Sequence, residues 1–157
     1  MSPAGNIVEC YGVSLRDGRL LGRRVEAGQD GDPDEVAARS IGLSDSAADG
    51  VALLHSTSWR WDPAGGSLVL TYLCCPDPCP EAGGELTLST HDDAVSSNNP
   101  SRPRPEAVSH AAALNHGLGH LAWLAANYPD TTRASQAAAP AVWGAITRMA
   151  EEVAGRI

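Results

Sequence analysis

The sequence contains no phenylalanine and no lysine, and aromatic residues make up only 4% of the chain. Its core must therefore be filled by Leu, Val, Ile and Ala, and the four Trp residues become informative positions. All eleven basic residues are Arg, and Ala, Gly and Pro are abundant, which indicates the codon bias of a GC-rich bacterium. Because of that bias, the presence of an Arg is not by itself evidence of function.

Positive charge is scarce in both halves of this acidic chain. The net charge is −8, with six Arg against fifteen acidic residues in residues 1–100 and five Arg against four in residues 101–157. A protein that binds the phosphate backbone normally concentrates Lys and Arg on one face. We therefore expect no nucleic-acid partner.

Long apolar runs are also missing. Residues 1–6 contain no basic region followed by an apolar run, and no later stretch is long enough to cross a bilayer. We expect a cytoplasmic protein without a membrane partner. In a reducing compartment, a domain large enough to have a core is expected to keep its cysteines as free thiols. These are Cys10, Cys74, Cys75 and Cys79.

What remains is the composition of one globular domain. A chain of 157 residues with 43% apolar and 19% charged residues is long enough to bury a single core. Its composition divides it into a strand-rich part (7–90), an exposed loop (91–105) and a helical part (106–157). We predict an α+β fold, with a mixed or antiparallel sheet and one short helix in residues 7–90, and C-terminal helices packing on that sheet.

Local patterns place the first elements. Apolar side chains recur from Ile7 to Leu15, with Glu9 among them, and again in residues 20–25. Asp17 and Gly18 between the two runs predict a hairpin with a type I′ turn. Further strands are expected over residues 51–61 and 67–75, as a central hairpin, and over residues 84–90.

Helix signals follow the same logic. Asp32 and Pro33 predict the start of a short helix that ends at Gly42. Apolar spacing predicts two longer helices, over residues 106–128 and 140–157. Gly117 and Gly119 in the first of these indicate either close packing or a local break.

The strand expected over residues 51–61 is unusually polar. Strict alternation places His55, Thr57, Trp59 and Trp61 on one face and Arg60 on the other. Imidazole, hydroxyl, indole and guanidinium groups together could hold an anionic or aromatic ligand. We predict His55, Thr57, Trp59 and Arg60 as ligand-binding residues, although an antiparallel strand with one solvated face has the same pattern.

Two histidines stand at helical spacing. His116 and His120 lie four residues apart, so both could ligate one divalent metal ion, whereas His110 lies too far around the helix to join them. The alternative is a pair of solvated histidines. No other cofactor is predicted.

Other reactive residues carry weaker signals. Cys74 and Cys75 should point to opposite faces of a strand, so that only Cys75 and Cys79 could share a metal, if the Pro-rich turn folds back. His91, Asp92 and Asp93 could bind a cation. No Gly-x-Ser-x-Gly elbow is present, which argues against serine hydrolase chemistry.

The order of elements from Tyr11 to Cys75 resembles the Nudix hydrolase superfamily: a hairpin over residues 12–21, a loop, a short helix with Ala37, Ala38 and Arg39, and further strands. In that family the helix carries an Arg-Glu pair and two further Glu residues that hold Mg²⁺ against a pyrophosphate. Here residues 40–43, Ser-Ile-Gly-Leu, follow Arg39, so only Arg39 carries over. The resemblance therefore implies a degenerate Nudix-like scaffold without its catalytic box.

These observations favour a non-catalytic module that binds a small molecule or a protein. The alternatives are a Mg²⁺-dependent hydrolase of nucleoside diphosphate derivatives, and a metal- or thiol-dependent protein that uses the His and Cys residues. The sequence leaves the oligomeric state open.

Overall fold

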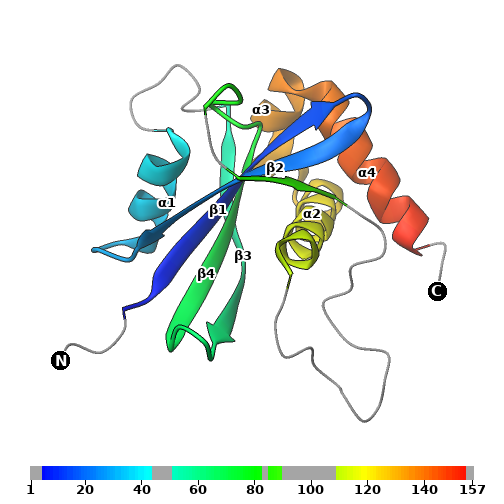
Figure 1. Cartoon of the computed structure of the whole chain (residues 1–157). Helices are drawn as coiled ribbons and strands as arrows, with labels where there is room; N and C mark the ends of the chain where they lie inside the picture. The colour runs from blue at the N-terminus through cyan, green and yellow to red at the C-terminus, as the bar shows by residue number, and fades with distance from the viewer. Residues whose placement is uncertain (1–4, 44–50, 83–84, 90–108, 155–157) are drawn as a thin grey trace, which may run out of the picture.

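The computed structural model describes residues 5–43, 51–82, 85–89 and 109–154 of the chain. They form a five-stranded mixed sheet with helix α1 on one face and helices α2, α3 and α4 on the other (Figure 1). The α+β class and the packing of the C-terminal helices on the sheet are as predicted. The loop expected over residues 91–105, which includes His91, Asp92 and Asp93, lies outside the described residues.

The sheet is built around its first strand. The strands are β1 (Ile7–Arg16), β2 (Arg19–Gly28), β3 (Leu53–Asp62), β4 (Ser67–Cys75) and β5 (Glu85–Leu88), and their order across the sheet is β3-β4-β1-β2-β5. β1 pairs antiparallel with β2 and parallel with β4.

We expected the second hairpin, formed by β3 and β4, to be central, but it forms one side of the sheet. β3 and β4 do pair antiparallel, yet β3 is the end strand. The physical reason is composition: β4 is mostly buried and takes the inner place beside β1, whereas the polar β3 tolerates a position with one strand neighbour.

The predicted turn and the short helix are confirmed in detail. Asp17 and Gly18 both have positive φ, 53° and 78°, as a type I′ turn requires. Helix α1 (Pro33–Ile41) begins where the Asp32 carboxylate accepts a hydrogen bond from the Asp34 backbone N–H. It ends at Gly42, whose φ of 97° favours glycine.

The helical part contains one helix more than predicted. Helices α2 (His110–Asn127) and α4 (Pro140–Ala154) match the expected ones, but α3 (Pro129–Ala138) lies between them. The helix predicted over residues 106–128 stops just before Pro129. Proline lacks an N–H that the first turn of a helix does not use, so the same residue opens the next helix.

Two apolar clusters, one on each face, hold the layers together. Helices α2 and α4 cover β1 and β4 through Leu114, Leu118, Leu121, Trp143 and Ile146. Helix α1 covers the other face through Val36, Ala37 and Ile41, which pack with Val8, Cys10 and Tyr72.

Candidate functional site

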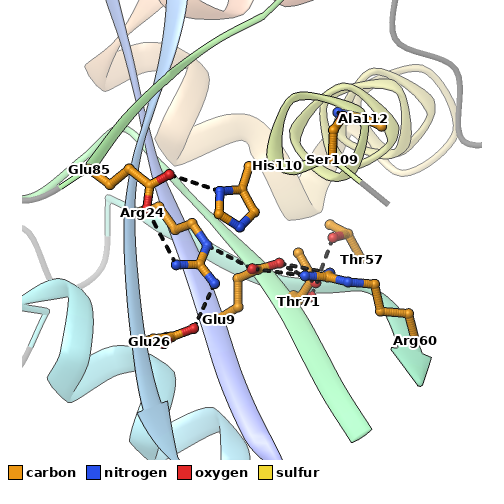
Figure 2. Close-up of polar contacts among 10 residues, drawn as sticks. All are labelled: Glu9, Arg24, Glu26, Thr57, Arg60, Thr71, Glu85, Ser109, His110 and Ala112. Atoms are coloured by element: carbon orange, nitrogen blue, oxygen red, sulfur yellow. Dashed lines mark hydrogen bonds and ion pairs between the residues drawn. The ribbon is translucent and has the colours of Figure 1, made fainter. Parts of the chain in front are cut away.

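A carboxylate lies buried in the middle of the sheet. Glu9 of β1 is 0% exposed and lies on the face that carries α2, α3 and α4, with Tyr11 and Val13 beside it on the same side of the strand. Its register partner on β4 is Thr71. Figure 2 shows Glu9 between the guanidinium groups of Arg24 from β2 and Arg60 from β3.

The Glu9 carboxylate accepts four hydrogen bonds. Its Oε1 accepts from Arg60 Nη1 and from Thr71 Oγ1, both at 2.9 Å. Its Oε2 accepts from Arg24 Nε at 2.8 Å and from Arg60 Nη2 at 3.1 Å. A carboxylate offers about four acceptor positions. No position is left to take a proton from a substrate or to ligate a metal ion, so this group ties four strands together rather than doing chemistry.

The network continues towards the β5 side of the sheet (Figure 2). Arg24 Nη2 donates to Glu26 Oε2 at 2.6 Å, and Arg24 Nη1 lies 3.7 Å from Glu85 Oε2. Glu85 in turn contacts His110 Nδ1 at 2.9 Å, at the first turn of α2. The polar contacts therefore join β2, β5 and α2 at one corner of the molecule.

The positive charges inside this network are fully offset by carboxylates. Burial alone would raise the pKa of Glu9, but the hydrogen bonds and positive charges of Arg60 and Arg24 outweigh it and hold that pKa below its usual value. The carboxylates of Glu9 and Glu26 offset the two arginines. The site therefore presents no excess positive charge for an anionic ligand.

The structure places the four predicted ligand residues on two faces. The β3–β4 pairing skips a residue at Thr57, because Ser56 pairs with Tyr72 and Ser58 with Thr71. This β-bulge breaks the strict alternation on which our expectation depended. His55, Thr57 and Arg60 consequently lie on the α2 face, whereas Trp59 and Trp61 lie on the α1 face.

These two tryptophans are exposed on the end strand of the sheet. Trp59 is 70% and Trp61 60% exposed, and both belong to β3, which has a strand neighbour on one side only in the described sheet. Tryptophan is large and apolar, so this degree of exposure is unusual for it. Trp123 on α2 is also exposed, but it contacts His120 and Tyr128.

His120 meets a histidine from the sheet. Its Nε2 atom lies 3.0 Å from Nε2 of His55, and the two ring planes are 12° from parallel, with centroids 4.9 Å apart. Burial, and to a smaller extent His120, lowers the pKa of His55. The structure thus brings together one residue from each of the two predicted sites. His116, one helical turn before His120, lies exposed on α2.

All four cysteines are free thiols, and three of them, Cys10, Cys74 and Cys75, lie in the core. Cys74 and Cys75 point to opposite faces, as predicted. The suggested Cys75 and Cys79 pair is wrong: Cys75 packs with α2 and α4, whereas Cys79 lies against Gly42 at the end of α1. Burial raises the pKa of Cys75 to about 12, and it also raises that of Cys10 and Cys74. Raised pKa values disfavour the reactive thiolate.

A second buried ion pair was not foreseen. Arg23 donates to both Asp77 oxygens at 2.9 Å and to the backbone carbonyl of Ile41 at 2.8 Å. A Cβ on Gly12 would lie 2.5 Å from Asp77 Cγ, so this pair needs a glycine on β1. It fastens the Pro-rich turn after β4 to β2 and to the end of α1.

Sequence reasoning named Arg60 but missed Arg24, Thr71 and the role of Glu9. The available signal was Glu9 itself, a charged residue at an inward position of an otherwise apolar strand face. A buried charge requires a partner of opposite sign. The partners could not be named without the strand order, because they come from three other strands.

No family model, curated protein or solved structure matches this chain. Arg39, the one residue carried by the Nudix resemblance, lies exposed in the last turn of α1. Within the described ranges, no three His, Cys, Asp or Glu side chains come close enough to share one metal ion. None of the helices in those ranges combines the length and hydropathy that crossing a bilayer requires.

Proposed function

We propose that this chain is a non-catalytic protein-interaction module and that its partner at β3 is a second copy of itself. The observation that carries the proposal is the exposure of Trp59 and Trp61 on one face of the end strand. Exposed strand edges readily pair with another strand, and buried tryptophans contribute strongly to protein interfaces. The saturated carboxylate of Glu9 supports a module without catalysis.

The spacing of the two tryptophans suits self-pairing. When two identical strands run antiparallel and are centred on Arg60, Trp59 of each copy lies opposite Trp61 of the other. Both cross-strand pairs then fall on the same face. Aromatic cross-strand pairs stabilise a sheet by up to about 1 kcal/mol each beyond what Ala pairs give. An antiparallel pairing of two β3 strands centred on Arg60 therefore covers all four indole rings.

The opposite face of the paired strands is compatible with this register. Ser58 would lie opposite Asp62 of the second copy, where its hydroxyl can donate to that carboxylate. Arg60 would face Arg60 of the second copy, but its guanidinium is directed back across β4 to Glu9. The negative charge of Glu9 offsets the repulsion that two opposed arginines would otherwise cause.

Sedimentation equilibrium over a concentration series tests the proposal. We expect the wild-type chain to change from monomer to dimer in the micromolar range, and the double variant Trp59→Ser/Trp61→Ser to stay monomeric. The matched control is Trp123→Ser, which removes an equally apolar exposed ring from α2 and should leave the dimer intact.

Two outcomes contradict the proposal. The first is a wild-type chain that remains monomeric up to several hundred micromolar. The second is a dimer that survives the double substitution but is lost in Trp123→Ser, because the interface would then lie on α2. The alternative of a Mg²⁺-dependent hydrolase has no comparable observation behind it in the described residues.

A further inference from the structure

The contact between His55 and His120 joins two elements, β3 and α2, that pack against each other. His55 stands on β3, two residues before the bulge at Thr57. His120 stands on α2, whose backbone approaches the sheet so closely at Gly117 that an added Cβ would lie 2.5 Å from Leu73. The ring of His120 also stacks on Trp123, with centroids 5.8 Å apart.

The spacing of the two ring nitrogens fits metal ligation. Zn²⁺ and neighbouring metals bind imidazole nitrogen at about 2.0–2.1 Å, so two ligands at near a right angle stand about 3 Å apart. The two Nε2 atoms are 3.0 Å apart. Without a metal, the same distance requires one ring to donate its only Nε2 proton to the other, which fixes a different tautomer on each histidine.

We propose that His55 and His120 bind one late first-row divalent ion, Zn²⁺, Ni²⁺ or Cu²⁺, through their Nε2 atoms. Imidazole nitrogen suits these ions, whereas Mg²⁺ and Ca²⁺ prefer oxygen ligands. His55 thus takes the place that His116 held in the pair predicted from the sequence.

The described residues supply two protein ligands to the ion. A metal ion binds the neutral imidazole through its unprotonated nitrogen, and the two Nε2 atoms face each other at 3.0 Å. Within the described ranges no third His, Cys, Asp or Glu reaches the pair. Among the described residues, the remaining coordination positions are therefore open to water or to an exogenous ligand, as in an exchangeable site.

This inference does not rest on self-pairing of β3. His55 and His120 belong to the same chain, so a monomer can bind the ion. Conversely, a dimer can form without metal, because the tryptophans lie on the other face of β3.

Isothermal titration of the untagged full chain with Zn²⁺, Ni²⁺ and Cu²⁺ at pH 7.5 tests the proposal. We expect one equivalent to bind, and the affinity to fall at least tenfold in His55→Gln and in His120→Gln. Glutamine retains hydrogen-bonding capacity, so these variants are expected to fold. The matched control is His116→Gln, which removes an exposed imidazole from the same helix and should leave the affinity unchanged.

A second measurement reports the position of the ion. Cu²⁺ quenches indole fluorescence at short range, and Trp123 lies on His120. Addition of Cu²⁺ should quench the wild-type chain and quench Trp123→Phe markedly less. The proposal is overturned if no ion binds up to millimolar concentration, if His55→Gln binds as tightly as the wild type, or if Trp123→Phe shows undiminished quenching.

Discussion

Glu9 shows what one buried charge requires of its surroundings. Its carboxylate is neutralised by Arg24 and Arg60, whose side chains are only 13% and 21% exposed, and Thr71 completes the set of donors. Such an arrangement need not stabilise the fold more than apolar residues of the same shape would. Removing one member is costly, however, because the remaining charges stay buried without their partner of opposite sign.

We predict that Glu9→Gln lowers the free energy of unfolding by about 3 kcal/mol, since it leaves two partly buried arginines without their shared carboxylate. Urea unfolding at pH 7 measures the change. Glu26→Gln removes the half-exposed carboxylate that also contacts Arg24, and it should cost less than about 1 kcal/mol. Equal losses in the two variants would contradict the central role of Glu9.

Glu9 should also determine how the free energy of unfolding changes at acid pH. The pKa of Glu9 is lower in the folded chain than in the unfolded one, so its contribution is complete above about pH 4.5 and is lost as the pH falls. The wild type should therefore lose stability more steeply than Glu9→Gln below that pH. Parallel curves would show that other carboxylates dominate acid unfolding.

Single residues also mark the limit of sequence reasoning. Alternation placed Glu9 on the inward face of its strand correctly. The same rule failed for Trp59, because the bulge at Thr57 depends on how β3 fits β4 and leaves no mark in the strand's own pattern. A rule of period two predicts a face only as far as the next irregularity.

At the scale of elements, α2 tests how closely a helix packs on the sheet. Its two interior glycines were expected to mark close packing or a break, and the helix is continuous from His110 to Asn127. An added Cβ on Gly117 would lie 2.5 and 3.0 Å from the two Cδ atoms of Leu73, whereas nothing lies within 4 Å of one on Gly119.

We predict opposite effects for two chemically identical substitutions in α2. Gly117→Ala should destabilise the chain by about 1–3 kcal/mol, because Leu73 must move within a packed core. Gly119→Ala should stabilise it by about 1 kcal/mol, because alanine loses less backbone entropy in a helix. Thermal unfolding of both variants measures these changes in stability. If both variants were more stable than the wild type, Leu73 would be able to move aside without a cost in packing.

Local sequence signals predicted where most helices and strands lie along the chain, but they did not predict which strands lie side by side in the sheet. The type I′ turn and the caps of α1 involve residues close in sequence, so Asp17, Gly18, Asp32 and Gly42 could be read directly. The missed helix α3 has no strong apolar stripe, since Thr132 and Ser135 are its buried residues. The place of β3 at the end of the sheet follows from competition among strands, which no single segment records.

At the scale of the whole molecule, three thiols set the alkaline limit of stability. Burial raises the pKa of Cys10, Cys74 and Cys75 in the folded chain. An acid whose folded pKa is raised contributes stability below its unfolded pKa, about 8.5 for a thiol, and loses it as the pH rises. Each of these thiols should add about 1.4 kcal/mol per pH unit to the decline.

We therefore predict that the free energy of unfolding, measured in urea with a reducing agent, falls steeply between pH 9 and pH 10. Cys75→Ala should reduce that slope by about 1.4 kcal/mol per pH unit, because one buried thiol no longer titrates on unfolding. Comparison of slopes removes the cost of the substitution itself, which shifts the curve uniformly. An unchanged slope would mean that Cys75 ionises within the folded chain.

The central position of β1 has a consequence for biosynthesis. β1 pairs with β2 immediately, but its second neighbour, β4, ends only at Cys75. At about 5–20 residues per second, translation from the end of β2 to that residue takes roughly 2–10 seconds. During this interval one side of the nascent hairpin offers unpaired amide and carbonyl groups to any other strand. Addition of β4, rather than formation of the first hairpin, is thus the step that covers this exposed edge of β1.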